Sequence, residues 1–213
     1  KDFACVHEWN HHSILANAWA PNGLWFAVIG RNQQLAVYDT SSKKVSNWKV
    51  VLTFQCEQAG LSLAWGPAVV DGLRYLAYGG EDKKVTIIEI RTYEGTWETV
   101  LEIPRGGIIY DLDWGKSGML AVAVGDGTVT VIDLAYLQVG WAVNEMDYNW
   151  QRQGITCFAE IRRSKGKNSM RTIRWIPEKL GADNLLAIGG TDGALEVLDL
   201  TERQRCKGFG NGL

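Results

Sequence analysis

Residues 108–134 read IIYDLDWGKSGMLAVAVGDGTVTVIDL, and this stretch holds the pattern from which the fold is predicted. Trp114 is followed by a glycine-containing turn and by an apolar segment, Met119 to Val124. The turn Gly125-Asp126-Gly127 then leads into a second apolar segment, Thr128 to Leu134. Glycine tolerates positive φ and Asp bonds to its own backbone, so both favour tight reversals. The stretch therefore predicts consecutive strands, rich in the β-branched residues of buried sheets.

The same pattern occurs four times along the chain. Each copy has a strand that ends on a tryptophan, a turn and two further apolar strands, and the first three copies end on a fourth, less regular strand. The anchoring tryptophans are Trp19, Trp65, Trp114 and Trp175, spaced 46, 49 and 61 residues apart. The first two spacings lie near the roughly 40–45 residues of one four-stranded propeller blade. We predict an all-β chain of four antiparallel, four-stranded propeller blades, at about residues 14–54, 61–103, 108–161 and 171–200, with a tail at 201–213.

This repeat resembles that of the WD-repeat family of β-propellers over nearly the whole chain. The matching features are the aromatic closing the inner strand, the Pro/Gly turn, the Gly-x-Asp reversal and an apolar third strand ending in Asp. Tyr38-Asp39, Ile132-Asp133 and Leu198-Asp199 occupy the family's Trp-Asp position. The second copy departs with Glu89-Ile90, and no Gly-His dipeptide stands where the family usually has one.

The resemblance also implies how the ring is completed. Four units are fewer than the family's usual seven blades, so we expect an incomplete ring or part of a larger one, with a four-bladed ring as the less favoured alternative. The chain opens on an outer-type strand, residues 3–9, and its last unit stops at a third strand, residues 194–200. In WD-repeat proteins the N-terminal outer strand completes the last blade, which removes an aggregation-prone edge. We expect these two segments to pair.

Composition argues against several classes of protein. A formal net charge of −2 gives no general attraction to nucleic acid or anionic membrane. No apolar run reaches the roughly 18 residues of a membrane span. The four scattered cysteines form no CxxC pair and favour a reducing setting, cytoplasmic or nuclear. Cys5, His7, His11 and His12 lack the usual zinc spacing, so we predict neither metal nor cofactor.

Catalytic motifs are absent from the sequence as well. It contains no phosphate-binding loop, Gly-x-Ser-x-Gly or HExxH motif, and Asp111 and Asp113 have no evident partner nucleophile or His. The sequence therefore predicts a non-catalytic scaffold that binds other proteins through blade loops, within a multi-subunit assembly, with no small-molecule substrate. A propeller hydrolase is the least favoured alternative.

The loops that precede the inner strands are expected to share one face with the Gly-x-Asp turns. That face would carry the one dense basic segment of the chain, residues 162–171. Its cations are Arg162, Arg163, Lys165, Lys167 and Arg171. Such a segment fits an acidic peptide or, as the alternative function, the phosphates of a nucleic acid. A merely solvated loop is the other interpretation.

An insertion at residues 135–155 is the second candidate partner site. Its aromatic residues are Tyr136, Trp141, Tyr148 and Trp150. Aromatic side chains favour interface cores because they bury a large area at a small entropic cost. The alternative is that these rings pack on the outer edge of a blade.

Two further sets of residues are predicted to be structural. The four anchoring tryptophans are expected to fill the wedges between neighbouring blades. Asp113 and Arg174 each precede an anchoring tryptophan in consecutive units, so we expect them to pair across two adjacent blades.

Overall fold

Short apolar segments separated by Gly and Asx turns fold into fifteen strands in the part of the chain that the structure describes. The computed structural model describes residues 13–67, 73–91, 94–115, 117–134, 157–162, 169–176 and 184–201. The first sheet contains β1 (Ile14–Trp19), β2 (Trp25–Gly30), β3 (Gln34–Asp39) and β4 (Lys49–Gln55), with the short 3₁₀ helix η1 (Val45–Asn47) before β4. The second contains β5 (Gly60–Trp65), β6 (Leu73–Gly80), β7 (Lys84–Arg91) and β8 (Thr96–Pro104).

The third sheet contains β9 (Ile109–Trp114), β10 (Met119–Val124), β11 (Thr128–Asp133) and β12 (Cys157–Arg162). The fourth contains β13 (Met170–Trp175), β14 (Leu185–Gly190) and β15 (Leu195–Asp199). Within each sheet the strands are antiparallel and follow chain order, so each is a simple up-and-down meander. The prediction of an all-β chain with four repeated sheets is confirmed. Three of the sheets have four strands, whereas the fourth has three among the described residues.

The turn between the second and third strands is built in the same way in every sheet, and we call it the reversal turn. A side-chain oxygen accepts a hydrogen bond from the backbone N–H two residues later, at Asn32, Asp82, Asp126 and Asp192. The next residue has a positive φ in each case, at Gln33, Lys83, Gly127 and Gly193. These Asx turns depend on local sequence, which is why the reversals could be predicted from it.

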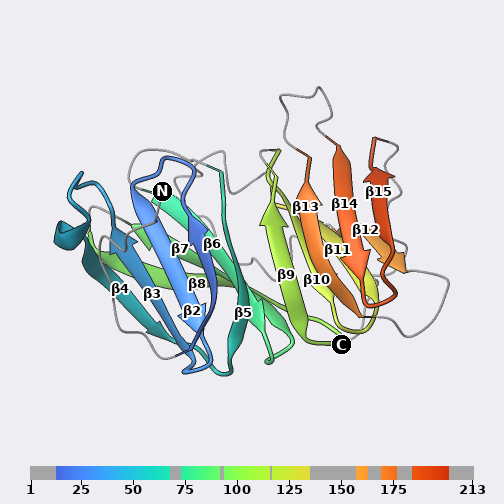
Figure 1. Ribbon diagram of the computed structural model, residues 1–213, viewed down its shortest axis with the longest axis horizontal. Coiled ribbons are helices and arrows are strands. Elements are labelled where there is room, and N and C mark those ends of the chain that lie inside the picture. The colour runs from blue at the N-terminus through green and yellow to red at the C-terminus, as the bar shows by residue number, and fades with distance from the viewer. Residues whose placement is uncertain are drawn as a thin grey trace, which may run out of the picture.

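The four sheets follow one another in space as they do in the chain (Figure 1). Their first strands, β1, β5, β9 and β13, lie side by side in that order, and we call them the inner strands. The described residues do not form a closed ring, so the structure by itself establishes repeated antiparallel sheets and their order.

Apolar side chains fill the space between each sheet and the next. Val37 of the first sheet and Ile88 of the second belong to one cluster, and both side chains are fully buried. The second and third sheets share another cluster, and the third and fourth share a third. Burial of apolar area contributes roughly 25 cal/mol per Å² to folding. These three clusters between the sheets are therefore the main contribution to the stability of the fold.

Several predicted features lie outside the described residues. These are the outer strand at residues 3–9, the insertion at 135–155 and residues 202–213 of the tail. The predicted pairing of residues 3–9 with the last strand therefore stays a prediction. Among the described helices, none is long and apolar enough to cross a membrane.

Candidate partner-binding surface

The first strand of every sheet carries a β-bulge at the same place. The pairing register shifts between Ile14 and Ala16 in β1 and between Gly60 and Ser62 in β5, with equivalent shifts in β9 and β13. Each shift leaves one residue without a cross-strand partner, and these residues are Leu15, Leu61, Tyr110 and Arg171. We call these four residues the bulge row. Because a bulge redirects a side chain and interrupts pairing, the row sets four side chains apart from the regular sheets.

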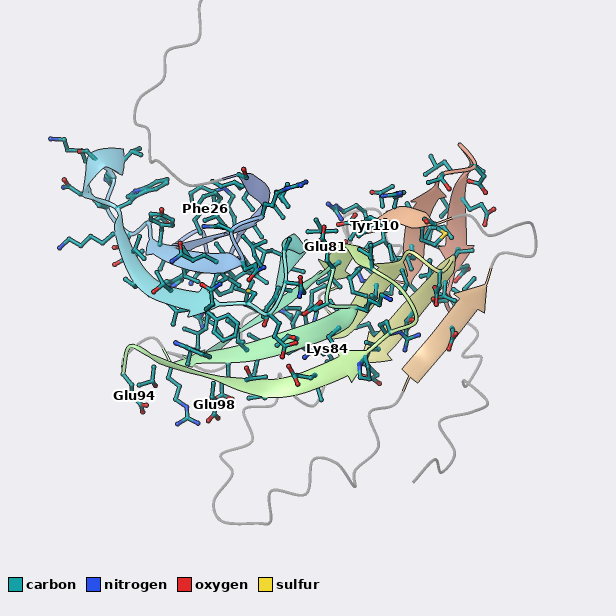
Figure 2. The ribbon with its side chains drawn as sticks, turned by 90° about the horizontal axis from the view of Figure 1, so that it is seen from below. Phe26, Glu81, Lys84, Glu94, Glu98 and Tyr110 are labelled. Atoms are coloured by element: carbon teal, nitrogen blue, oxygen red, sulfur yellow. The ribbon has the colours of Figure 1, made fainter. Side chains whose placement is uncertain are left out.

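The bulge row lies on the same side of the molecule as the reversal turns. Backbone hydrogen bonds join each reversal turn to the residue before an inner strand, from Arg31 N–H to Ser13 at 3.0 Å and from Glu81 N–H to Ala59 at 3.0 Å. Gly125 and Thr191 make the equivalent bonds in the third and fourth sheets. The loops that enter the inner strands therefore share a face with the reversal turns, as the sequence predicted. Figure 2 shows Glu94 and Glu98 projecting at the other end of the second sheet, far from Tyr110.

Tyr110 and Arg171 form the polar half of the bulge row. The guanidinium carbon of Arg171 lies 3.7 Å from the centroid of the Tyr110 ring, which is a cation–π contact. A Cβ atom on Gly125 would come within 2.9 Å of Tyr110 Cε2, so this glycine leaves room for the ring. Arg171 is exposed, and no carboxylate of the described residues pairs with it. The ring therefore orients the guanidinium of an exposed arginine.

Beside this row, the buried carboxylate of Asp111 joins three inner strands. On β13 it accepts hydrogen bonds from Ile173 N–H at 2.9 Å and from the Thr172 hydroxyl at 3.2 Å. On β5 the Ser62 hydroxyl donates to it at 3.2 Å. Arg174 Nη1 lies 2.7 Å from the same carboxylate and completes an ion pair. Because most of its partners come from other sheets, Asp111 fixes the relative positions of the strands that carry the bulge row.

The prediction that Arg174 pairs with Asp113 is wrong, because its partner in the structure is Asp111. Arg174 pairs with Asp111, whereas Asp113 accepts a hydrogen bond from Trp175 N–H at 2.6 Å. Burial raises the pKa of the Asp113 carboxyl, and the Trp175 N–H bond and the charge of Arg174 oppose that rise. Residues two apart in a strand lie on the same face, so Asp111 and Asp113 share one face of β9. Their positions in the sequence therefore do not show which carboxylate reaches Arg174.

The anchoring tryptophans differ in burial: Trp65 is buried between the first and second sheets, whereas Trp19 is half exposed. Trp65 is 6% exposed, and its indole N–H donates to the Ala18 carbonyl of the first sheet at 3.1 Å. Trp175 repeats this bond to the Asp113 carbonyl at 3.1 Å. Trp114 is partly buried and packs near Gly66 of the second sheet. Trp19 is 50% exposed, because it lies on the face of the first sheet that points away from the second.

The structure describes only part of the predicted partner site. Arg162 ends β12 opposite Thr128, and Arg171 belongs to the bulge row. The remaining predicted partner residues lie outside the described residues and are Arg163, Lys165, Lys167, Tyr136, Trp141, Tyr148 and Trp150. The other members of the bulge row and Asp111 were missed as candidates. An alignment of the four copies on their anchoring tryptophans would have found the row, because each member stands four residues before an anchoring tryptophan.

A shallow cavity of about 530 Å³ lies at the end of the first sheet, near η1. Its polar groups mostly hold the loop itself together. Asp39 accepts from Ser41 N–H at 2.9 Å, and the Trp48 indole donates to the Ser42 carbonyl at 2.9 Å. Among the described residues, no three His, Cys, Asp or Glu side chains are grouped as metal ligands.

The sequence matches no protein-family model and no curated protein. The assignment of function therefore depends on the bulge row, the contacts that hold it and the order of the sheets.

Proposed function

We propose that this chain is a non-catalytic scaffold of WD-repeat type that holds partner proteins on its bulge-row face. In this proposal the four sheets are blades of a β-propeller and the inner strands face its channel. The order of the sheets, their meander topology and the adjacency of β1, β5, β9 and β13 support the propeller arrangement.

The observation that carries the proposal is the bulge at one position in all four inner strands. A bulge interrupts a ladder of hydrogen bonds, so its presence in every sheet is best explained by the side chains that it presents. Those side chains change along the row from leucine, with Leu15 39% exposed, to tyrosine and arginine. Apolar contacts followed by an oriented cation fit a polypeptide segment with apolar and acidic side chains.

The test is affinity capture with the tagged chain from cells, followed by mass spectrometry. Arg171→Glu reverses the charge at the polar end of the row, and we expect it to lose a defined set of proteins that the unaltered chain retains. Lys43→Glu makes the same charge change in the exposed loop near η1, so it serves as the matched control and should retain the set.

Two outcomes would contradict the proposal. One is an identical set of captured proteins for Arg171→Glu and Lys43→Glu. The other is binding of RNA or DNA that falls steeply with salt and is weakened by Arg171→Glu alone, which would favour the nucleic-acid function.

A further inference from the structure

Side chains of the inner strands accept hydrogen bonds from the backbone of the next inner strand. Ser62 on β5 accepts from Leu112 N–H of β9 at 2.9 Å. Asp111 on β9 accepts from Ile173 N–H of β13, also at 2.9 Å. In both cases the acceptor stands three residues before its anchoring tryptophan, and the donor stands two residues before the next one. We call the position of Ser62 and Asp111 the first acceptor place.

A second acceptor place stands one residue before the anchoring tryptophan. Between the third and fourth sheets, Asp113 accepts there from Trp175 N–H at 2.6 Å. Between the second and third sheets this bond is not made, because Ala64 stands at the equivalent position and has no side-chain acceptor. Among the described residues, each side-chain oxygen at either place therefore makes the bond wherever a next sheet follows.

The junction between the first and second sheets has neither of these bonds. Ala16 and Ala18 stand at the two acceptor places of β1. The equivalent donors on β5 are the backbone N–H groups of Leu63 and Trp65. Beyond their own sheet, the described residues provide no acceptor for either group.

Strand pairing shows that these two N–H groups point away from β6, the strand that pairs with β5. Gly66 N–H donates to the Tyr75 carbonyl at 2.8 Å, within the second sheet. Because N–H groups alternate in direction along an antiparallel strand, those of Trp65 and Leu63 point to the free edge of β5, as Leu112 N–H does on β9. Leu63 and Trp65 are each 6% exposed. Buried N–H groups are nearly always paired, so these two need an acceptor.

We propose that a partner protein supplies the two acceptors, through an extended segment with carboxylates two residues apart. The chain contains the template for this arrangement, because Asp111 and Asp113 stand two apart on β9 and bond to N–H groups two apart on β13. Side chains two apart in a strand share one face and lie roughly 7 Å apart, which matches the spacing of the donors. A carboxylate also accepts from a backbone N–H more strongly than a neutral oxygen does. Ala16 and Ala18 keep part of their surface exposed, so the segment has access beside them.

This acid-binding edge adjoins the apolar half of the bulge row, because Leu15 directly precedes Ala16. The inference deepens the proposed function and rests on it for the source of the acidic segment. It does not involve Arg171, which lies at the other end of the row. Recognition of acidic residues at β5 and capture of proteins by the bulge row are therefore measured separately.

The experiment is an NMR titration of the chain with the capped peptide Gly-Ser-Asp-Leu-Asp-Ser-Gly. We expect the amide resonances of Leu63 and Trp65 to move most. The control peptide Gly-Ser-Asp-Asp-Leu-Ser-Gly has the same composition and charge, but in an extended segment its carboxylates point to opposite faces. It should bind at least about tenfold more weakly, because only one of the two bonds forms.

A variant of the chain supplies the acceptor from within. Ala16→Asp places a carboxylate at the first acceptor place, so it should slow hydrogen exchange of Leu63 N–H and weaken binding of the first peptide about tenfold or more. Asn17→Asp is the matched control, because it adds the same charge on the opposite face of β1 and should change neither quantity. If Ala16→Asp does not fold, Ala16→Ser replaces it and reproduces the arrangement of Ser62.

Three outcomes would overturn the inference. The first is equal binding of the two peptides, and the second is an equal effect of Ala16→Asp and Asn17→Asp. The third is exchange of Leu63 and Trp65 N–H in the free chain as slow as that of Leu112 N–H, which would mean that a segment of the chain itself supplies the acceptors. Failed protein capture with intact discrimination between the peptides would contradict the proposed function alone.

Discussion

The carboxylate of Asp111 connects β5, β9 and β13. Its removal tests how much this connection contributes to the free energy of unfolding. We expect Asp111→Ala to lower the free energy of unfolding by roughly 2–4 kcal/mol, because it leaves the buried N–H of Ile173 without its acceptor. Urea unfolding followed by circular dichroism measures the change. Arg174→Met is the control, and it should cost about 1 kcal/mol or less because Arg174 is mostly exposed. Equal losses for the two variants would contradict this assignment.

Asp113 gives a residue-scale prediction about pH. Burial raises the pKa of its carboxyl above the ordinary value of 3.8, so the folded chain holds this proton more tightly than the unfolded chain. The contribution of Asp113 to stability is therefore most favourable below pH 3.8 and falls as pH rises through the raised pKa. Asp113→Asn keeps an oxygen for Trp175 N–H and removes the charge. We expect the variant to be more stable than the unaltered chain at neutral pH.

The same comparison below pH 3.8 is the control for Asp113→Asn. Both chains are then uncharged at position 113, and the difference in unfolding free energy should disappear. Urea unfolding at the two pH values measures it. A variant that is less stable at neutral pH would show that attraction to Arg174 outweighs burial of the charge.

At the scale of elements, the contact between β6 and the start of β5 requires a glycine. A Cβ atom on Gly80 would lie 2.0 Å from the Ala59 carbonyl oxygen and 2.9 Å from Gly60 Cα, and both are backbone atoms. Gly30 in the first sheet meets the Ser13 carbonyl in the same way. We expect Gly80→Ala to lower the free energy of unfolding by about 3 kcal/mol, because backbone cannot move aside as a side chain can.

Gly193→Ala is the matched control for Gly80→Ala. Gly193 lies in a reversal turn with φ of 75° and nothing within 4 Å of an added Cβ atom. Its substitution should cost only about 1 kcal/mol, from the left-handed backbone conformation alone. Thermal unfolding of both variants distinguishes the two effects. If Gly193→Ala were the more damaging change, backbone conformation rather than the strand contact would dominate at these glycines.

At the scale of the whole molecule, the cost of one substitution depends on which sheet carries it. Val131 and Val197 occupy aligned positions on β11 and β15 and are 0% and 55% exposed. We expect Val131→Asp to destabilise the fold by more than about 3 kcal/mol, since it buries an unpaired charge between two sheets. Val197→Asp should change the free energy of unfolding by about 0.5 kcal/mol or less, because the side chain is already exposed. Urea unfolding compares them, and similar losses would mean that this face of the fourth sheet is covered within the chain.

Local sequence accounts for the strands and for the reversal turns between them. Gly125-Asp126-Gly127 makes an Asx turn from its own atoms, and the apolar segments on either side pair as the pattern predicts. The bulge row was not predicted, although it stands at a constant distance from the anchoring tryptophans. A bulge is a mismatch between two strands, so it appears only when their pairing is known. The ion pair of Arg174 was likewise assigned to the wrong carboxylate, because choosing between Asp111 and Asp113 requires the packing of β9 against β13.

The sequence by itself therefore determined four copies of an antiparallel unit and the local turns that shape each one. These features depend on contacts between residues close in the chain, where Gly, Asx and β-branched residues act directly. Only the tertiary structure decided which of four equivalent tryptophans is buried, which carboxylate holds Arg174 and which valine faces water. Trp19 and Val197 belong to the same repeat as their buried counterparts, yet no described sheet packs against them. Burial depends on the neighbouring sheet, and a repeat looks the same in sequence whether that neighbour is present or absent.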